Sequence, residues 1–281
     1  MDIVKKQLIL KTVLGVLLGV AAVSLVGIIV TANKYAKGKQ EYAKLEGYVS
    51  IEAEKAPVVE PEKEVEEAEV EEVSEEQEEV VRMINVDFDM DYAALKAINS
   101  DLVGWIYYEG LDLSYPVVMD RGDDYYEHHT FEKKSNGAGA IFMDFLCKSD
   151  FTSFNSIIYG HNMRNDTMFG ALNNAIDNQK IIEENPYFYV FTENEALMYR
   201  IVSAYYTKNN SNTYNINLDY ELYDMQDYVD YMDSVSLYRD DEFFGEEVTE
   251  DTKLCTLSTC HGLHSTSRTV IHGVLVAREP R

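Results

Sequence analysis

Two alternating segments near the C-terminal end constrain this fold more than any other feature of the chain. Residues 253–260 contain neither Gly nor Pro and alternate between two sets of side chains, Leu254, Thr256, Ser258 and Cys260 against Cys255, Leu257 and Thr259. This period of two predicts a β-strand. A second strand-like segment, residues 268–276, follows after seven residues that include Gly262. The connection suits an antiparallel hairpin, in which Arg268 would lie beside Cys260 across the ladder.

Cys260, Arg268 and a histidine far upstream together provide a thiol, a guanidinium and an imidazole. His161 follows the strand-like run 157–160, which ends in Gly160, so we expect it at the mouth of a loop. A thiolate can attack a carbonyl, an imidazole can move protons, and a fixed guanidinium can face developing negative charge. The alternative for a free cysteine is a small buried apolar residue. The three residues together favour a cysteine acyl-transfer site.

Three ordered motifs resemble the sortases, the membrane-anchored cysteine transpeptidases of Gram-positive bacteria. They are YGHNM at 159–163, TLSTC at 256–260 and the following Arg268. Class B in particular is similar to this chain at VGWI (103–106), YPVV (115–118), DYY (124–126), GAIFMD (139–144) and TMFG (167–170). The resemblance spans residues 91–276. It implies a mostly β fold, a closed β-barrel of about eight strands with peripheral helices, preceded by one transmembrane helix.

The resemblance also implies an activity and its partners. Cys260 would attack a C-terminal sorting motif after its Thr and hold the protein as a thioester, and the motif would be of the Asn-Pro-x-Thr or Ser-Pro-x-Thr type. His161 would move protons to and from the amines, and Arg268 would bind the oxyanion or the substrate carbonyls. The partners would be a secreted protein with a sorting signal and a lipid-linked peptidoglycan precursor that supplies the amine. Ser258, Thr259 and Asn162 are candidate substrate-binding residues.

Other functions remain open at this point. A hydrolytic cysteine peptidase could use the same three residues, and a non-catalytic binding module anchored at the wall would bury Cys260. Cys255, Cys260, His261 and His264 are of zinc-ligand type, but their spacing matches no common zinc pattern and the strand puts the two cysteines on opposite faces. We therefore expect neither a metal nor a cofactor.

The remaining cysteines and histidines are expected to be structural. The chain has three cysteines, which excludes a disulfide-rich scaffold, and Cys147 and Cys255 are predicted to lie in the core. His128 and His129 occupy a polar, turn-like segment and should be exposed. His272 shares the parity of Arg268 and is predicted to be a core or edge histidine.

Residues 12–33 form an apolar run of 22 residues without a charge. About 20 residues cross a bilayer core. A cleaved signal peptide is the alternative, but its apolar region is usually only about 7–15 residues long. We therefore predict an uncleaved single-pass anchor in the cell membrane, after a short cytoplasmic tail at residues 1–11. Lysines flank both ends of the run, so the positive-inside rule does not orient it. The family resemblance implies an extracellular catalytic domain.

The charge pattern separates the anchor from the rest of the chain. Residues 52–79 contain 14 Glu and two Lys, which predicts a solvated, flexible acidic stalk within residues 34–84. A catalytic domain is expected at 85–281. Residues 82–281 carry 15 Lys and Arg against 33 Asp and Glu, which argues against nucleic acid as a partner.

Within the predicted domain, short strand-like runs alternate with polar clusters rich in Gly, Asn and Asp. The strand-like runs are 113–118, 139–143, 156–159, 187–192 and 196–206. Helical spacing of apolar residues predicts an N-terminal helix at 89–99 and a long inserted helix near 218–237.

Overall fold

The computed structural model describes residues 3–53, 84–163, 165–215, 222–260 and 266–281. The helices are α1 (Ile3–Leu45), α2 (Tyr92–Ile98), α3 (Leu172–Asp177), α4 (Lys180–Glu184), α5 (Leu222–Val235) and α6 (Asp241–Gly245), with 3-10 helices η1 (Glu46–Tyr48), η2 (Glu109–Leu111), η3 (Tyr125–Glu127) and η4 (Asn212–Tyr214). The strands are β1 (Val49–Ala53), β2 (Val86–Met90), β3 (Leu102–Tyr108), β4 (Leu113–Met119), β5 (Ile141–Met143), β6 (Asn155–Tyr159), β7 (Tyr187–Phe191), β8 (Glu195–Lys208), β9 (Tyr238–Arg239), β10 (Leu254–Cys260) and β11 (Ser267–Pro280).

Eight of these strands close into a barrel. The order is β11-β10-β6-β5-β4-β3-β7-β8, and the pairing of β8 with β11 closes the ring, while the short β9 adds to β8 outside it. Strands β8 and β11 each have 14 residues, and two register shifts in their ladder mark bulges, one at Val202 of β8 and one at Val276 of β11. Such bulges bend a strand, as closure of a small barrel requires. The predicted mostly β, closed-barrel fold is confirmed.

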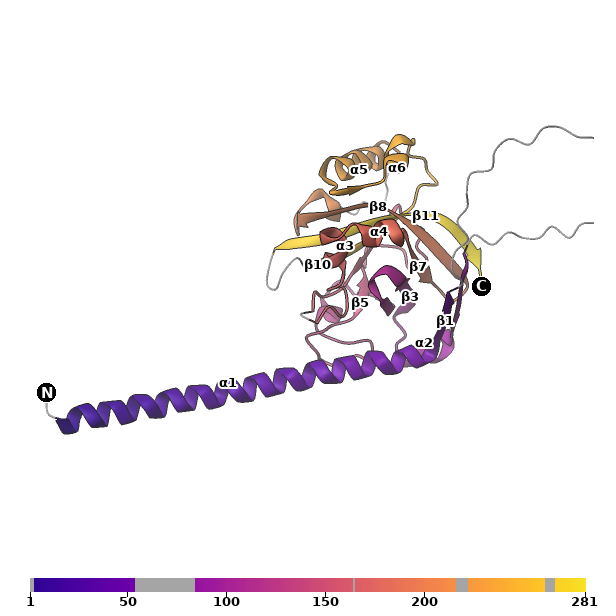
Figure 1. Ribbon diagram of the computed structural model, residues 1–281. Helices are drawn as coiled ribbons and strands as arrows, with labels where there is room; N and C mark the ends of the chain where they lie inside the picture. Colours follow the sequence, from indigo (N-terminus) through magenta and orange to yellow (C-terminus); the bar gives the residue numbers. More distant parts are fainter. Residues whose placement is uncertain (1–2, 54–83, 164, 216–221, 261–265) are drawn as a thin grey trace, which may run out of the picture.

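The interior of the barrel is filled by large apolar side chains from alternate positions of its strands. Trp105, Phe188 and Tyr199 are among the largest fully buried residues. A second, smaller core lies where α5 and α6 cover the outer side of β8 (Figure 1), and it includes Met232 and Phe243. The helices therefore bury the outer apolar positions that the barrel leaves uncovered.

The site is positioned by strands β6, β10 and β11. The β10–β11 ladder is antiparallel and pairs Cys260 with Arg268, so the predicted hairpin is confirmed. Strands β6 and β10 run parallel, with Tyr159 paired to Ser258. Because parallel strands leave a sheet at the same edge, the segment that carries His161 and the end of β10 emerge side by side.

Helix α1 runs along the lower side of the barrel and projects far beyond it (Figure 1). By length and composition it is the one helix among the described residues that could cross a membrane. Residues 11–36 are exposed, whereas Gly38, Glu41, Tyr42 and Leu45 are buried against the barrel. Their spacing of three and four residues forms one helical face. The last third of α1 is therefore part of the domain.

The predicted stalk at residues 34–84 is wrong for its first part. Residues 34–45 are helical and packed, η1 follows, and β1 pairs antiparallel with β2 from Val49↔Met90 to Ala53↔Val86. The packed helical face and the ladder supply the contacts that offset the ordering entropy of a charged segment. The rest of the acidic segment, residues 54–83, lies outside the described residues. The covalent chain from α1 to the barrel runs through this segment, but the packed residues 34–45 and the β1–β2 ladder hold α1 against the barrel independently of it.

The two predicted helices have different limits in the structure. The N-terminal helix begins at Tyr92 rather than at residue 89, because the preceding residues pair as β2 and Asp91 caps the helix by accepting from the backbone nitrogen of Ala94. Caps of this kind fix a helix start. The inserted helix spans Leu222–Val235, and the predicted residues 218–221 lie outside the described ranges.

Candidate active site

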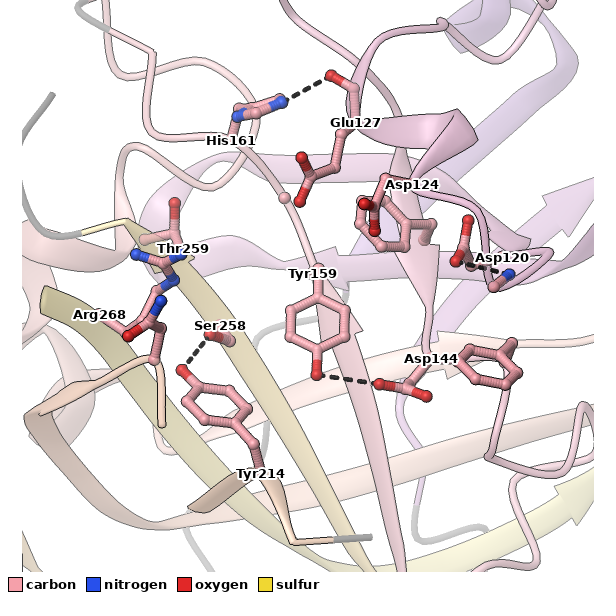
Figure 2. Close-up of a pocket in the computed structure, with 15 residues that line it drawn as sticks. Asp120, Asp124, Glu127, Asp144, Tyr159, His161, Tyr214, Ser258, Thr259 and Arg268 are labelled. Carbon is pink, nitrogen blue, oxygen red and sulfur yellow. Dashed lines mark hydrogen bonds between the residues drawn. The ribbon is translucent and has the colours of Figure 1, made fainter. Parts of the chain in front are cut away.

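A groove of about 380 Å³ opens at the edge of the sheet where β6 and β10 end (Figure 2). Its walls come from the loops after β4, β5 and β6, from the segment around η4, and from the facing ends of β10 and β11. The described lining residues are Asp120, Gly122, Asp124, Glu127, Phe142, Asp144, Phe145, Tyr159, Gly160, His161, Asn209, Tyr214, Ser258, Thr259 and Arg268.

The nucleophile candidate is placed here by its backbone. Cys260 is the last residue of β10 and pairs with Arg268, which lines the groove. Ser258 and Thr259, immediately before it, line the groove as well. The backbone nitrogen of Gly160 donates to the carbonyl of Ser258 at 3.1 Å, which extends the β6–β10 contact up to the residue before His161. The structure thus brings the segments of all three predicted catalytic residues to one edge.

His161 is held in one tautomer. Its Nε2 lies 2.7 Å from the backbone carbonyl oxygen of Glu127. A carbonyl can only accept, so Nε2 carries the hydrogen and Nδ1 is the ring nitrogen left for proton exchange. In Figure 2 the ring lies between this carbonyl and the Thr259–Arg268 side of the groove. The hydrogen bond therefore fixes the ring so that protons are exchanged through Nδ1.

Two glycines allow the approach of the His161 segment. A Cβ on Gly160 would lie 2.4 Å from Cδ1 of Ile141 and 2.7 Å from Cγ of Phe169. Gly139 has a φ of +60°, and a Cβ there would lie 2.6 Å from the carbonyl oxygen of Tyr126 and 2.9 Å from Cδ2 of His161. Contacts this short exclude a side chain at either position, and a positive φ favours glycine further.

Carboxylates dominate the charge of the groove. Asp120, Asp124, Glu127 and Asp144 line it, and Arg268 is the only Lys or Arg among the described lining residues. Asp144 accepts a hydrogen bond from Oη of Tyr159 at 3.0 Å, and Oδ2 of Asp120 accepts from the backbone nitrogen of Gly122 at 3.0 Å. The groove therefore has an acidic wall and one cationic corner next to Cys260.

The predicted substrate-binding residues divide between the groove and its surroundings. The hydroxyl of Ser258 is hydrogen-bonded to Oη of Tyr214 at 2.7 Å, and Thr259 is buried with its side-chain oxygen unpaired among the described residues. Asn162 pairs with Met168 in an isolated bridge behind His161 and is not among the lining residues. A role for Asn162 would therefore be to hold the loop.

The other cysteines lack the environment of a nucleophile. Burial raises the pKa of the Cys147 thiol to about 12, and burial raises the pKa of the fully buried Cys255 well above its ordinary value. Thiols of this kind stay protonated and unreactive at neutral pH. Both cysteines pack in the barrel core, as predicted.

His272 is a core histidine, as predicted, and belongs to a buried hydrogen-bond network. The one hydroxyl hydrogen of Thr256 goes to Oδ1 of Asn155 at 2.7 Å, so Thr256 accepts from Nδ1 of His272 at 2.8 Å. Nε2 then accepts from Oη of Tyr205 at 2.9 Å. Burial lowers the pKa of His272 to about 3, because this site does not solvate a charge. The imidazole is therefore neutral.

The network continues to the groove wall. Nδ2 of Asn155 donates to Oη of Tyr228 at 2.8 Å, and that hydroxyl donates to the carbonyl oxygen of Thr213 at 3.0 Å. The next residue is Tyr214, which bonds Ser258 in the groove. His272 thus helps to fix η4 and its tyrosine without reaching the groove itself.

The histidines outside these two sites are peripheral where they are described. His128 is exposed, and His129 is half-buried, with Nδ1 2.8 Å from the carbonyl oxygen of Tyr125 and its ring stacked on that tyrosine. His261 and His264 lie outside the described residues. Within the described part of the chain, no group of three or more His, Cys, Asp and Glu side chains is arranged to hold a metal ion.

Sequence reasoning missed several groups that shape the groove. The carbonyl of Glu127 orients His161, and a backbone acceptor leaves no residue-type signal. Tyr159 and Asp144 both lie within the segments that resemble class B sortases, so those motifs gave a usable signal. Tyr214 joins the site only through the fold, since it is 44 residues from Ser258 in the sequence.

Comparison with known proteins decides the family. The family model described as the sortase domain matches residues 106–276, more than half of the chain. The chain belongs to the sortase family. Sortase B of Staphylococcus aureus is 32% identical over 191 residues, which cover 64% of this chain and 72% of that protein.

Solved structures agree. A crystal structure of Clostridium perfringens sortase B has a TM-score of 0.59 and 30% identity, and the match covers 66% of this chain and 99% of that one. The Staphylococcus aureus sortase B–substrate complex has a TM-score of 0.59 and 29% identity, with 66% and 84% covered. The chain is a class B sortase and hence a cysteine transpeptidase of the cell wall.

Proposed function

We propose that this sortase uses Cys260 as nucleophile, His161 as proton carrier and Arg268 as the oxyanion contact. The observation that carries the proposal is the pairing of Cys260 with Arg268 at the end of β10, beside the strand that leads into His161. No other described cysteine has such surroundings, since Cys147 and Cys255 are buried in the core. The three groups meet the requirements of acyl transfer to and from a thiolate.

In the first half-reaction, the Cys260 thiol has given its proton to His161, and the Sγ thiolate bonds to the carbonyl carbon of the sorting-motif Thr. The carbonyl electrons move to its oxygen, where the permanently charged guanidinium of Arg268 stabilises them. Collapse of this intermediate breaks the peptide bond after Thr, and the departing amine takes a proton from His161. The products are a thioester on Cys260 and the free C-terminal fragment.

In the second half-reaction, an amine of the peptidoglycan precursor attacks the thioester carbon. His161 accepts a proton from the amine, the C–S bond breaks, and the thiolate of Cys260 returns. A new amide bond links the sorted protein to the precursor. The acidic wall of Asp120, Asp124, Glu127 and Asp144 supports this step, because carboxylates raise the local concentration of an ammonium group.

The substrate class and location belong to the same proposal. The relative from Staphylococcus aureus is described in a complex with substrate, and a groove open along one side suits an extended peptide. A sorting motif of the Asn-Pro-x-Thr or Ser-Pro-x-Thr type is proposed. The apolar part of α1 would anchor the protein in the cell membrane with the barrel on the extracellular face, where a lipid-linked precursor is accessible.

Mass spectrometry of the protein incubated with a panel of sorting peptides tests the proposal. A thioester adduct on Cys260 is expected with Asn-Pro-x-Thr or Ser-Pro-x-Thr peptides, and no adduct is expected with the C260A variant. Adding an amine acceptor should convert the adduct into an amide product. Release of free acid at the same rate with and without the amine would instead favour a hydrolytic peptidase. Failure of every peptide to form an adduct would remove the catalytic assignment.

A further inference from the structure

The last third of α1, residues 34–45, is seated on the turn that carries the acceptor of His161. We call these residues the docking segment. The carbonyl oxygen of Lys34 accepts from Nδ2 of Asn136 at 2.8 Å, and Oε1 of Glu41 accepts from the backbone nitrogen of Glu132 at 2.9 Å. Glu41 is only 5% exposed. Buried polar contacts of this kind fix one arrangement of two elements.

Tyr42 makes the central contact of the docking segment. It is 7% exposed, and its hydroxyl donates to the carbonyl oxygen of Gly139 at 2.7 Å. Its ring meets the ring of Tyr115 edge to face, with centroids 5.5 Å apart. One side chain of the helix thus contacts both the glycine turn and strand β4.

The first connection from Tyr42 to His161 runs through Gly139. The Cα of this glycine faces the imidazole so closely that a Cβ would lie 2.9 Å from Cδ2 of His161. The same Cβ would lie 2.9 Å from the carbonyl oxygen of Glu127, the acceptor of Nε2. Gly139, whose carbonyl accepts the hydrogen bond from Tyr42, therefore packs directly against the imidazole ring of His161.

The second connection runs through Tyr115. Its Oη accepts from the backbone nitrogen of Met168 at 3.0 Å, and Met168 pairs with Asn162. The backbone nitrogen of Phe169 donates to the carbonyl oxygen of His161 at 3.1 Å. Tyr42 therefore contacts two residues, Gly139 and Tyr115, that each hold part of the backbone or ring of His161 in place.

We propose that the docking segment positions His161, with Tyr42 as the positioning residue, so that full turnover requires the helix to be seated on the barrel. The inference rests on the proposed role of His161 as proton carrier. The contacts of Tyr42 lead to His161 in two ways, through Gly139 and through Tyr115. Neither set of contacts leads to a described residue of β10 or β11. Loss of the Tyr42 hydroxyl should therefore disturb proton transfer and leave peptide binding unchanged.

The Y42F variant of the full chain in detergent micelles tests this proposal, with Y35F as the matched control. Tyr35 is on the same helix and is 45% exposed, so its hydroxyl can be removed without opening the interface. A small displacement of a catalytic group costs rate, so we expect kcat of Y42F to fall by about fivefold, with KM within about twofold of the wild type. Y35F should match the wild type in both constants.

The competing explanation is a purely structural contact, and thermal unfolding separates the two. A Y42F variant with a lower Tm but an unchanged kcat, measured about 25 °C below its own Tm, would overturn the proposal. So would a change confined to KM. H161A, measured in parallel, isolates the underlying assumption. An active H161A would refute the proposed function, whereas an inactive H161A with Y42F equal to Y35F would refute the positioning role alone.

Discussion

Cys260 and Arg268 are directly paired across the antiparallel ladder of β10 and β11. Paired residues in such a ladder have Cα atoms about 4.5–5.5 Å apart. The pairing is a property of the backbone register, which a change of side chain at either position leaves in place. Substitutions at these two residues should therefore report on chemistry rather than on folding.

Replacing the nucleophile should abolish transfer. C260A removes the thiolate that attacks the sorting peptide, and we expect no thioester and no amide product by mass spectrometry. C255A is the matched control on the same strand. It should keep turnover and lose about 1–2 kcal/mol of unfolding free energy, because it leaves a small cavity in the core. Turnover near the wild-type level in C260A would contradict the assignment.

The guanidinium of Arg268 should not be replaceable by an ammonium. R268K keeps the charge but loses the planar fork, so kcat/KM should fall by at least about tenfold, equal to roughly 1.4 kcal/mol of transition-state stabilisation. Steady-state kinetics with a sorting peptide and an amine measure the change. Full activity of R268K would mean that Arg268 acts only as a diffuse positive charge.

Proton transfer should depend on one histidine. H161A should lower kcat by at least about a hundredfold, because it removes the proton carrier of both half-reactions. H128A, at an exposed position, should keep full activity, and H261A and H264A should keep most of it. EDTA should have no effect. Loss of activity in H261A or H264A equal to that in H161A, or inhibition by EDTA, would point to a metal centre.

Acid should destabilise the fold through His272. Its pKa is lowered to about 3 by burial, so the unfolded chain binds a proton below about pH 6.5 that the folded chain does not. The stability that the folded protein gains from a neutral His272 is therefore fully present above about pH 6.5. As the pH falls from there towards about 3, the free energy of unfolding decreases by roughly 1.4 kcal/mol per pH unit. Urea unfolding between pH 4.5 and 7 measures this slope.

H272Q is the variant for that measurement. It should be less stable at neutral pH, since it disturbs the buried network, but its stability should fall less steeply with acid. H128Q removes an exposed histidine and should keep the wild-type slope. An unchanged slope in H272Q would mean that other groups account for the acid sensitivity.

The acidic segment should be dispensable for the fold and for transfer. Because Ala53 and Val86 are paired, joining Ala53 to Ile84 through two glycines leaves a four-residue loop of ordinary hairpin length. Shortening the connection at residues 54–85 to four residues is three halvings of its length and lowers the entropic cost of loop closure by about 2 kcal/mol. We therefore expect Tm of this deletion to be equal to or above that of the wild type, and kcat/KM to stay close to the wild-type value. A large loss of transfer would indicate a partner that binds residues 54–83.

The sequence predicts the β10–β11 hairpin, which carries Cys260 and Arg268, better than it predicts residues 34–53. Alternation in residues 253–260 and 268–276 sufficed for the β10–β11 hairpin, because one buried face leaves a period of two. Closure of the barrel came from the family resemblance, since no local pattern encodes the β8–β11 pairing. Strand β3 lacked a clear signal because Gly104 interrupts it, and that glycine is there because a Cβ would lie 2.8 Å from the carbonyl oxygen of Phe191.

The charged residues of the docking segment led to the wrong prediction of a flexible stalk from residue 34 onwards. Residues 34–45 carry lysines on the exposed sides, so they resemble a solvated linker. The buried set at Gly38, Glu41, Tyr42 and Leu45 contains only one aliphatic residue, and its helical spacing is therefore hidden from a hydrophobicity pattern. The orientation of His161 was not predictable either, because it depends on a carbonyl 34 residues away in sequence.

The uninterrupted course of α1 has a consequence for how substrates arrive. Nine residues separate Asn33, the end of the apolar run, from Tyr42, which corresponds to about 14 Å of helix. A flexible tether would let the barrel sample many heights, whereas a helix packed at its far end allows one. With the apolar run in a bilayer, the groove stays at a constant level above the lipid. Membrane-bound substrates would then reach it by lateral diffusion, and turnover would follow their density in the membrane plane rather than their bulk concentration.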